Sequence, residues 1–331
     1  MITKSINILN LNVPCCNRCA YCLLSYDGNI LGVDYEKSVN YANAFYQWLK
    51  INHPEINFAY FFGYSMEHPQ LFEAIEFMQK TNSPGGEFLQ LDGLKKRTTN
   101  ELESFLVKLK NSGIKLINLT FYGTEEFHDT FAGRKGDFTL MVNTLNIAHD
   151  IGLNVEVGIP ALKNNVNQLE ELVKLLSVNE TPVRIFTPHS GGKGKNLINQ
   201  KITIDDYNLL SEQVKMRFNR NNNRTQFEWF LNPPEEVTAR TLVISLLASN
   251  FDDLQKQSFE QTIKHLESLD ENYYSAVPSF QALLAKYCDK NDNRLYTKKD
   301  LYNIYRNKFI QENNLKIVDI TDERFSGSIR Y

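Results

Sequence analysis

The chain has 331 residues, of which 42% are hydrophobic and 23% are charged, so it can bury the core of one large α/β domain, with or without an appendage. Its formal net charge of −3 gives no electrostatic reason to expect nucleic acid or an anionic membrane surface as a partner. It lacks the continuous apolar core of a signal peptide and any run of about 18 apolar residues, so we expect a cytoplasmic protein with reduced thiols and no membrane partner.

Apolar runs of strand length alternate with segments of helical period from the N-terminus to about residue 218. The sequence predicts strands at 6–13, 57–64, 87–94, 115–123, 154–162 and 182–189. The helices predicted between and after them lie at 35–51, 69–81, 99–113, 138–152, 167–178 and 203–218. This alternation is typical of a parallel sheet with right-handed crossovers and predicts an α/β fold, a partial (β/α)6 TIM-like barrel.

A polar stretch at 219–224 ends the alternation. The segments predicted after it are a strand at 225–232, helices near 237–249, 252–268, 278–288 and 298–313, and a strand-like segment at 315–320. We therefore divide the chain into a partial barrel, residues 1–218, and a mostly helical C-terminal appendage, residues 219–331, which we expect to cap the barrel opening.

Four of the five cysteines follow the first predicted strand, at positions 15, 16, 19 and 22, where the catalytic rim of a barrel lies. A reducing compartment argues against a disulfide framework, and a structural zinc site usually needs a second pair of ligands, which the chain lacks. A thioredoxin-like pair would use Cys19 and Cys22 alone and leave the other two unexplained. An iron–sulfur cluster is held by thiolates, and three ligands would leave one iron open for catalysis.

The motif C-x3-C-x2-C of Cys15, Cys19 and Cys22, with Tyr21 before the third cysteine, resembles the radical S-adenosylmethionine (radical SAM) superfamily. The resemblance implies that these cysteines ligate one [4Fe–4S] cluster, whose open iron binds the amino and carboxylate groups of S-adenosyl-L-methionine. It also implies reduction by a flavodoxin- or ferredoxin-type donor, and a 5′-deoxyadenosyl radical that abstracts a substrate hydrogen atom. Cys16 is expected to be a small buried filler rather than a fourth ligand.

The family usually carries Gly-Gly-Glu-Pro after strand two, where it receives the amino group of S-adenosylmethionine. This sequence has Gly63, Tyr64 and Ser65 there, so a tyrosine replaces the acid, and we expect Glu67 to compensate. A literal Gly-Gly-Glu at 85–87 precedes strand three and is therefore expected at the opposite end of the barrel.

Later segments resemble the family more closely. Thr120 takes the place of a serine that reaches the cofactor, and Arg134 is close enough in sequence to pair with the cofactor's carboxylate. Asn165 is expected to contact the ribose or adenine. His189 opens a glycine-rich strand-six exit at which the backbone can approach adenine.

For several other residues the sequence favours a structural role. The pair His128-Asp129 is read as a helix-entry cap, and Lys193 and Lys195 as solvated loop lysines. Cys288 follows Leu284 at helical spacing and is expected to pack against apolar side chains; the alternative is a hydrogen-atom donor to a substrate radical.

The substrate expected from the resemblance is a peptide, a ribosomally made precursor (RiPP-like), because the stretch at 128–138 looks like peptide-modifying members. Only Cys288 lies outside the cysteine motif, so an auxiliary cluster domain is not expected. The alternatives are the same chemistry on a small metabolite, a cluster-bearing binding or regulatory protein with a degenerate S-adenosylmethionine site, and a zinc-binding module.

Overall fold

The computed structural model describes residues 2–10, 15–23, 32–63, 66–177, 180–235, 239–316 and 328–330. The strands are β1 (Ile2–Asn10), β2 (Asn57–Phe62), β3 (Phe88–Gln90), β4 (Leu116–Thr120), β5 (Asn154–Pro160), β6 (Val183–Phe186), β7 (Ala239–Leu246) and β8 (Ser328–Arg330). The helices before β7 are α1 (Tyr35–Asn52), α2 (Leu71–Lys80), α3 (Thr99–Asn111), α4 (Glu125–Ala132), α5 (Asp137–Asp150), α6 (Leu169–Leu176), α7 (Ile204–Asn208), α8 (Glu212–Lys215) and α9 (Gln226–Leu231). Those after β7 are α10 (Phe251–Lys256), α11 (Phe259–Ala276), α12 (Phe280–Tyr287) and α13 (Lys298–Glu312).

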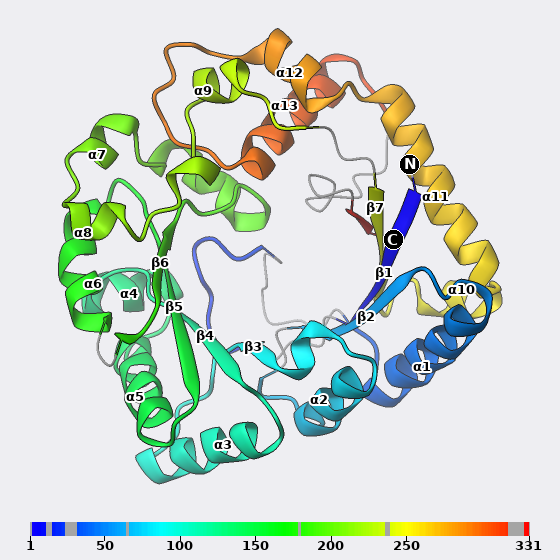
Figure 1. Cartoon of the computed structure of the whole chain (residues 1–331), viewed down its shortest axis with the longest axis horizontal. Coiled ribbons are helices and arrows are strands. Elements are labelled where there is room, and N and C mark those ends of the chain that lie inside the picture. The colour runs from blue at the N-terminus through cyan, green and yellow to red at the C-terminus, as the bar shows by residue number, and fades with distance from the viewer. Residues whose placement is uncertain are drawn as a thin grey trace.

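The strands form two four-stranded sheets in the orders β2-β1-β7-β8 and β3-β4-β5-β6. Within each sheet, neighbouring strands pair in parallel. Figure 1 shows the strands around a common centre with α1, α2, α3 and α5 outside them. Parallel strands joined through outer helices are the arrangement of a (β/α) barrel. The predicted fold class is confirmed.

The side-chain alternation along β3–β6 separates a helix-facing core from an inward face. Apolar residues alternate along β4 and β5, where Ile117, Leu119, Val155 and Val157 are buried and belong to the main core. Burying such a side chain contributes about 1.5–3 kcal/mol. Because successive side chains of a strand point to opposite faces, the residues between these core positions face the centre of the barrel.

Two predictions for the C-terminal third were wrong. The predicted strand at 225–232 is helix α9, which begins with a capping box between Thr225 and Glu228. The predicted helix at 237–249 contains β7, whose Ile244 pairs with Ile8 of β1 in parallel register. An apolar run of this length does not distinguish a buried strand from a buried helix by periodicity.

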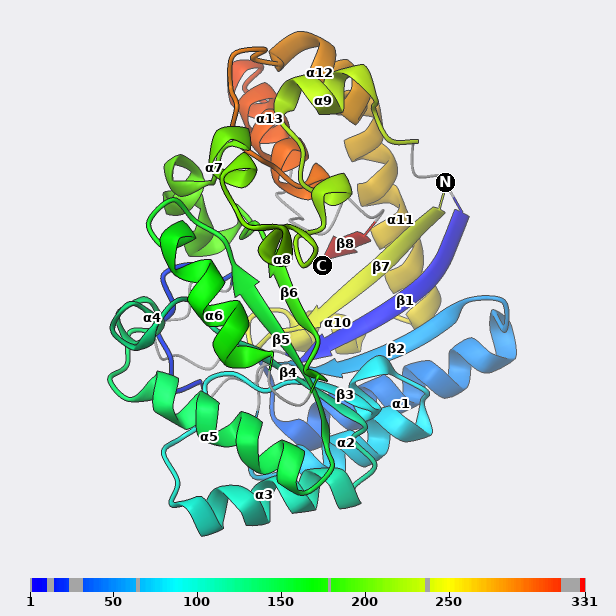
Figure 2. The same cartoon turned by 60° about the vertical axis from the view of Figure 1, so that its left-hand side comes forward.

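The sheet that contains β1 continues into the C-terminal third through β7, so strand pairing crosses the predicted boundary at residue 218. Figures 1 and 2 show α9, α12 and α13 between β6 on one side and β7 on the other. The division into a barrel and a capping appendage stays a prediction. Residues 317–320 of the predicted last strand lie outside the described residues. No described helix has both the length and the apolar character to cross a membrane.

Candidate functional site

A cavity of about 600 Å³ lies inside the barrel at the C-terminal ends of β3–β6. One side of it is formed by residues 15–23, which we call the cysteine loop. The lining residues are Cys15, Asn17, Cys19, Tyr21, Cys22, Leu23, Gln90, Asp92, Asn118, Thr120, Tyr122, Glu156, Gly158, Arg184, Ile185, Phe186, His189, Arg217, Asn219, Asn222, Asn223 and Thr297. Ligands of (β/α) barrels bind at this end of the strands.

The inward face of the strands carries a row of polar side chains. In the parallel register Gln90 pairs with Asn118, and Asn118 pairs with Glu156. The Glu156 carboxylate accepts hydrogen bonds from Asn118 Nδ2 at 3.3 Å and from the Arg184 guanidinium at 2.5 Å. Our sequence analysis missed Glu156 and Arg184, although polar residues at every second position of a strand signal an inward face.

Backbone hydrogen bonds fix the cysteine loop to the barrel. The N–H groups of Arg18 and Ala20 donate to the carbonyls of Ala132 and Phe131 at 2.8 and 2.9 Å. These carbonyls belong to the last turn of α4, where helical carbonyls have no partner within the helix. The Cys16 N–H donates to Gly93 O at 3.0 Å. Cys16 itself is exposed, so the prediction that it is a buried filler was wrong.

Two glycines let the backbone approach the cysteine loop closely. Gly93 has a φ of +70°, and a Cβ there would lie 2.4 Å from Cys15 Sγ. Gly192 has a φ of +53°, and its Cβ would lie 2.2 Å from Leu23 O. Other residues rarely adopt this backbone region, and neither position has room for a side chain.

A buried polar network also supports the loop. The Asp137 carboxylate accepts hydrogen bonds from Asn17 Nδ2 at 3.0 Å and from His128 Nε2 at 3.1 Å. His128 Nε2 carries the proton because its Nδ1 accepts from the Tyr122 N–H. Burial raises the pKa of Asp137, but the hydrogen bonds from His128 and Arg134 outweigh it, so the pKa is lowered overall. Asp137 is therefore a charged anchor for the loop.

The helix-entry interpretation of His128-Asp129 is confirmed for Asp129 and wrong for His128. His128 is buried inside α4 and belongs to this network. Asp129 accepts hydrogen bonds from the N–H groups of Gly136 and Phe138 and so supports the start of the next helix, α5.

Cys15, Cys19 and Cys22 all line the cavity. The Cys19 thiol lies 3.3 Å from the Tyr122 hydroxyl. Burial raises the pKa of Cys15, and it raises the pKa of Cys19 to about 12. These thiols are therefore protonated at neutral pH unless a bound cation stabilises the thiolates. In the part of the chain that the structure describes, no three His, Cys, Asp or Glu side chains are oriented as a metal site.

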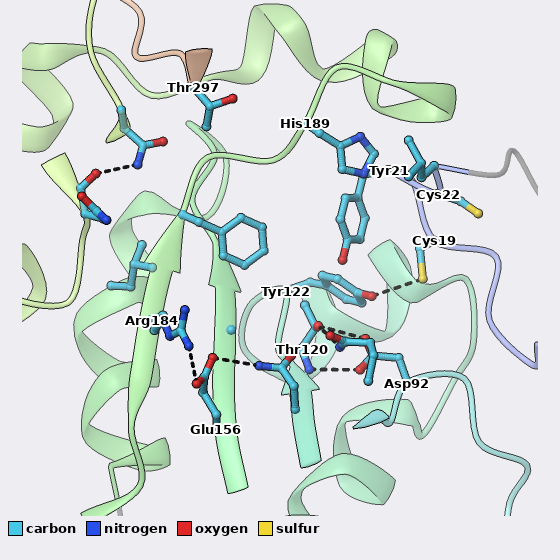
Figure 3. Close-up of a pocket in the computed structure, with 18 of the residues that line it drawn as sticks. Cys19, Tyr21, Cys22, Asp92, Thr120, Tyr122, Glu156, Arg184, His189 and Thr297 are labelled. Atoms are coloured by element: carbon cyan, nitrogen blue, oxygen red, sulfur yellow. Dashed lines mark hydrogen bonds and ion pairs between the residues drawn. The ribbon is translucent and has the colours of Figure 1, made fainter. Parts of the chain in front are cut away.

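Aromatic rings surround the thiols. The Tyr21 ring contacts Tyr122 edge-on at 5.5 Å between centroids and His189 at 5.4 Å. Figure 3 shows His189, Tyr21 and Tyr122 one after another along the cavity, beside Cys19 and Cys22. The structure thus brings three predicted cofactor contacts, Tyr21, Thr120 and His189, to one cavity with the three cysteines.

Two predicted contacts point elsewhere. Glu67 forms a two-pronged ion pair with Arg97, at 2.7 and 2.8 Å, and also accepts the Lys95 N–H. Arg134 donates to Leu94 O and to Asp137 beneath the cysteine loop. Neither side chain lines the cavity, because each is held by its own buried partners.

Three further predicted positions, Asn165, Gly63 and Cys288, also lie outside the cavity lining. The Asn165 amide is fully buried and donates to the Tyr122 and Pro160 carbonyls, so it joins the loops after β4 and β5. Gly63 ends β2, with its N–H donating to Asn10 O. Cys288 terminates α12, where burial raises its pKa. Tyr64 and Ser65 lie outside the described residues.

Asp92 is a cavity residue that our sequence analysis missed. Its carboxylate accepts hydrogen bonds from the Thr120 N–H at 3.0 Å, from Thr120 Oγ1 at 2.9 Å and from Gln90 Nε2 at 2.5 Å. Burial raises its pKa to about 6. The signal was available, because an acid directly after a predicted barrel strand is placed at the catalytic rim.

No protein-family model matches the chain. Fe-coproporphyrin III synthase of Methanosarcina barkeri is 27% identical over 101 residues, which are 30% of this chain and 25% of that protein. Streptococcus suis SuiB bound to the precursor peptide SuiA has a TM-score of 0.51 at 11% identity, covering 74% of this chain and 58% of SuiB.

Two further solved structures share less of the backbone arrangement. Methylornithine synthase (PylB) gives a TM-score of 0.44 at 13% identity, covering 81% of this chain and 82% of PylB. HemN of Escherichia coli, a coproporphyrinogen III oxidase described as a radical SAM enzyme, gives a TM-score of 0.37 at 14% identity. The match covers 65% of this chain and 50% of HemN.

The chain spans a quarter of the curated relative and 58% of SuiB. At 11% identity the similarity to SuiB shows a shared fold. This shared fold agrees with the partial α/β barrel that the resemblance drawn from the cysteine motif implies.

Proposed function

We propose that this chain, which has the fold of radical SAM enzymes, is itself such an enzyme, with one [4Fe–4S] cluster at Cys15, Cys19 and Cys22. The observation that carries the proposal is the joint placement of these three thiols on one fixed loop at the mouth of the barrel cavity. An enzyme that used the thiols only for structure would have no need to expose them to a cavity of about 600 Å³.

The donor set suits the cluster. Thiolates are the usual ligands of iron–sulfur clusters, and three of them leave one iron for S-adenosylmethionine. Burial raises the pKa of Cys15 and Cys19, so a bound cation would favour their thiolates. Rotation about the Cα–Cβ bond changes the direction of each sulfur without moving the backbone. When bound, the cluster and S-adenosylmethionine supply the one-electron cleavage that starts hydrogen-atom abstraction.

The chain's own residues position and shield this chemistry. Tyr21 and His189 offer ring surfaces, and Thr120 a hydroxyl, for the nucleoside side of S-adenosylmethionine. Tyr122 packs at 4.7 Å against Phe131, behind the thiols, where it excludes water from the reacting end. An electron donor of flavodoxin or ferredoxin type completes the proposal.

The first experiment counts iron and follows S-adenosylmethionine cleavage after anaerobic reconstitution. We expect a brown protein with four irons per chain that forms 5′-deoxyadenosine with a reductant. The combined variant Cys15→Ala, Cys19→Ala and Cys22→Ala is expected to hold no cluster, because all three ligands are lost. The control Cys16→Ala removes an exposed thiol from the same loop and is expected to keep four irons.

Two results contradict the proposal. A colourless protein with stoichiometric zinc indicates a zinc-binding module, and a brown protein that leaves S-adenosylmethionine intact indicates a cluster-bearing binding or regulatory protein.

For the substrate, we propose a peptide of the RiPP-like precursor class. The support is the shared fold with SuiB, which was solved with its precursor peptide. The Arg184 side chain, 71% exposed, and Glu156 provide charged groups at the strand side of the cavity for such a substrate. The cavity volume also falls within the range of small-molecule sites, so a small metabolite is the second candidate.

Release of 5′-deoxyadenosine with and without peptides encoded near the gene separates the two candidates. We expect release to increase at least tenfold with the cognate peptide. Release that increases only with small metabolites favours the second candidate.

A further inference from the structure

Asp92 lies beside the proposed cluster ligands. The residue after it, Gly93, accepts the Cys16 N–H at 3.0 Å and has its Cα against Cys15 Sγ. Figure 3 shows Asp92 and Cys19 on the same side of the cavity, with Tyr122 near both. The Asp92 carboxylate therefore lies in the same cavity that would hold the cluster and its ligand.

The Asp92 carboxylate is half-buried, and its described hydrogen-bond partners are all neutral. Thr120 and Gln90 supply three donors, and no Lys, Arg or His of residues 2–10, 15–23, 32–63, 66–177, 180–235 and 239–316 forms an ion pair with it. Since a carboxylate has about four acceptor sites, one remains for a ligand.

Other buried acids near the cavity differ in this respect. Glu67 is paired with Arg97, Asp137 with Arg134 and His128, and Glu156 with Arg184. A buried charge that is hydrogen-bonded but lacks a counter-charge is costly, and a cation or a strong N–H donor compensates it. Asp92 is therefore the acid in this cavity that is prepared for a ligand amine.

We propose that Asp92 accepts a hydrogen bond from the amino group of S-adenosylmethionine, an inference that rests on the proposed function. The chain has Tyr64 where the family pattern places an acid after β2, and Glu67 is held by Arg97. Asp92 supplies the missing carboxylate from the end of the neighbouring strand, β3. The acid thus reaches the cofactor from a different strand than the motif predicts.

The test is a double-mutant cycle between the protein and the ligand, measured as Kd by anaerobic equilibrium dialysis. The protein is wild type or Asp92→Asn, reconstituted to four irons, and the ligand is S-adenosylmethionine or its analogue without the amino group. We expect D92N to weaken S-adenosylmethionine binding about ten- to a hundredfold, as for loss of a charged hydrogen bond. D92N should bind the deamino analogue as wild type does, because the group that Asp92 recognises is absent.

The matched control is Glu67→Gln, which removes the acid that the family pattern suggests, one that lies outside the cavity lining and already has Arg97 as its partner. We expect E67Q to keep the wild-type Kd for S-adenosylmethionine within about twofold. Asp92→Glu keeps the charge and should recover part of the lost affinity. If D92N does not hold four irons, Asp92→Ser replaces it in the cycle.

Specific outcomes overturn the inference. If D92N binds both ligands more weakly by the same factor, Asp92 affects only the shape of the site. If D92N binds S-adenosylmethionine with wild-type affinity but no longer turns over the substrate, the amine that Asp92 recognises belongs to the substrate. Both outcomes leave the proposed function standing, whereas wild-type protein that binds neither cluster nor S-adenosylmethionine refutes the proposed function itself.

Discussion

The charge of Asp92 has a consequence for stability that is independent of any ligand. Its pKa in the folded chain is about 6, raised by burial from 3.8. Between pH 4 and 6 the folded chain keeps the proton that the unfolded chain has already released. Stability contributed by this group therefore falls as pH rises through that window and stays low above it.

We predict that Asp92→Asn stabilises the cluster-free protein at pH 7.5 and has a smaller effect on it near pH 4.5, where most of the loss of stability has not yet occurred. The pKa shift of about 2 units, at about 1.4 kcal/mol each, corresponds to on the order of 3 kcal/mol. Urea unfolding of both proteins at the two pH values measures the difference. A stability gain that is the same at both pH values would show that the charge of Asp92 is not its cause. Stabilisation by removing a site residue is a common sign that the residue is retained for binding.

At the same scale, residue type and spacing predict the cluster ligands but do not reveal the proposed acid. The spacing of Cys15, Cys19 and Cys22 is a local property, so the sequence predicts their shared role. The choice between Glu67 and Asp92 depends on Arg97, which lies 30 residues after Glu67 and takes both of its carboxylate oxygens. Such a contact is decided by packing between strands, which spacing along the chain does not reveal.

At the scale of elements, the cysteine loop depends on a glycine in the turn after β3. Gly93 combines a positive φ with direct contact to Cys15 Sγ. We predict that Gly93→Ala displaces the cysteine loop, so that the reconstituted protein holds fewer than four irons per chain. The backbone contribution to the loss of stability is on the order of 1 kcal/mol.

The matched control for this variant is Gly152→Ala. Gly152 also has a positive φ, +68°, but the nearest atom to its Cβ position is the flexible Lys110 Nζ at 3.4 Å. We expect G152A to lose a similar backbone free energy and to keep all four irons. Equal iron content in G93A and G152A would refute a specific role for Gly93 at the loop.

The elements themselves were predicted with unequal success. The six strand–helix units were recognisable because amphipathic helices and apolar strands carry different periods. The sequence predicts a strand in the region of α9 and a helix in the region of β7, because short apolar runs fit a helix and a strand equally well. For α9, the capping box of Thr225 and Glu228 was the signal that distinguishes a helix. For β7, pairing with β1 decides its structure.

At the scale of the whole molecule, a buried ion pair joins the strand-six exit to the C-terminal helices. Lys201 Nζ lies 3.0 Å from Asp300, and both side chains are almost fully buried. Asp300 also accepts the Ser190 N–H at 2.7 Å, next to His189, and Lys201 donates to Pro188 O at 2.6 Å. The position of α13 is therefore coupled to the cavity wall.

We predict that Asp300→Asn lowers the free energy of unfolding by about 3 kcal/mol, because it leaves the Lys201 charge buried without a counter-charge. Urea unfolding measures the change. The control Asp253→Asn breaks an exposed pair with Lys256 and is expected to cause no measurable change. Equal effects of the two substitutions would mean that burial of the Lys201–Asp300 pair does not matter for stability.

The sequence alone determined the fold class, and it placed the candidate site, with the three cysteines of the motif, at the C-terminal rim of the barrel. These conclusions depend on periodicity and spacing, which are properties of neighbouring residues. Only the tertiary structure decided that Asp92, Glu156 and Arg184 face the cavity, that Glu67, Arg134 and Asn165 are held elsewhere, and that β7 extends the sheet of β1. The reason is physical: alternation shows which residues share a strand face, but closure of the barrel decides which face is inside and which distant charges meet.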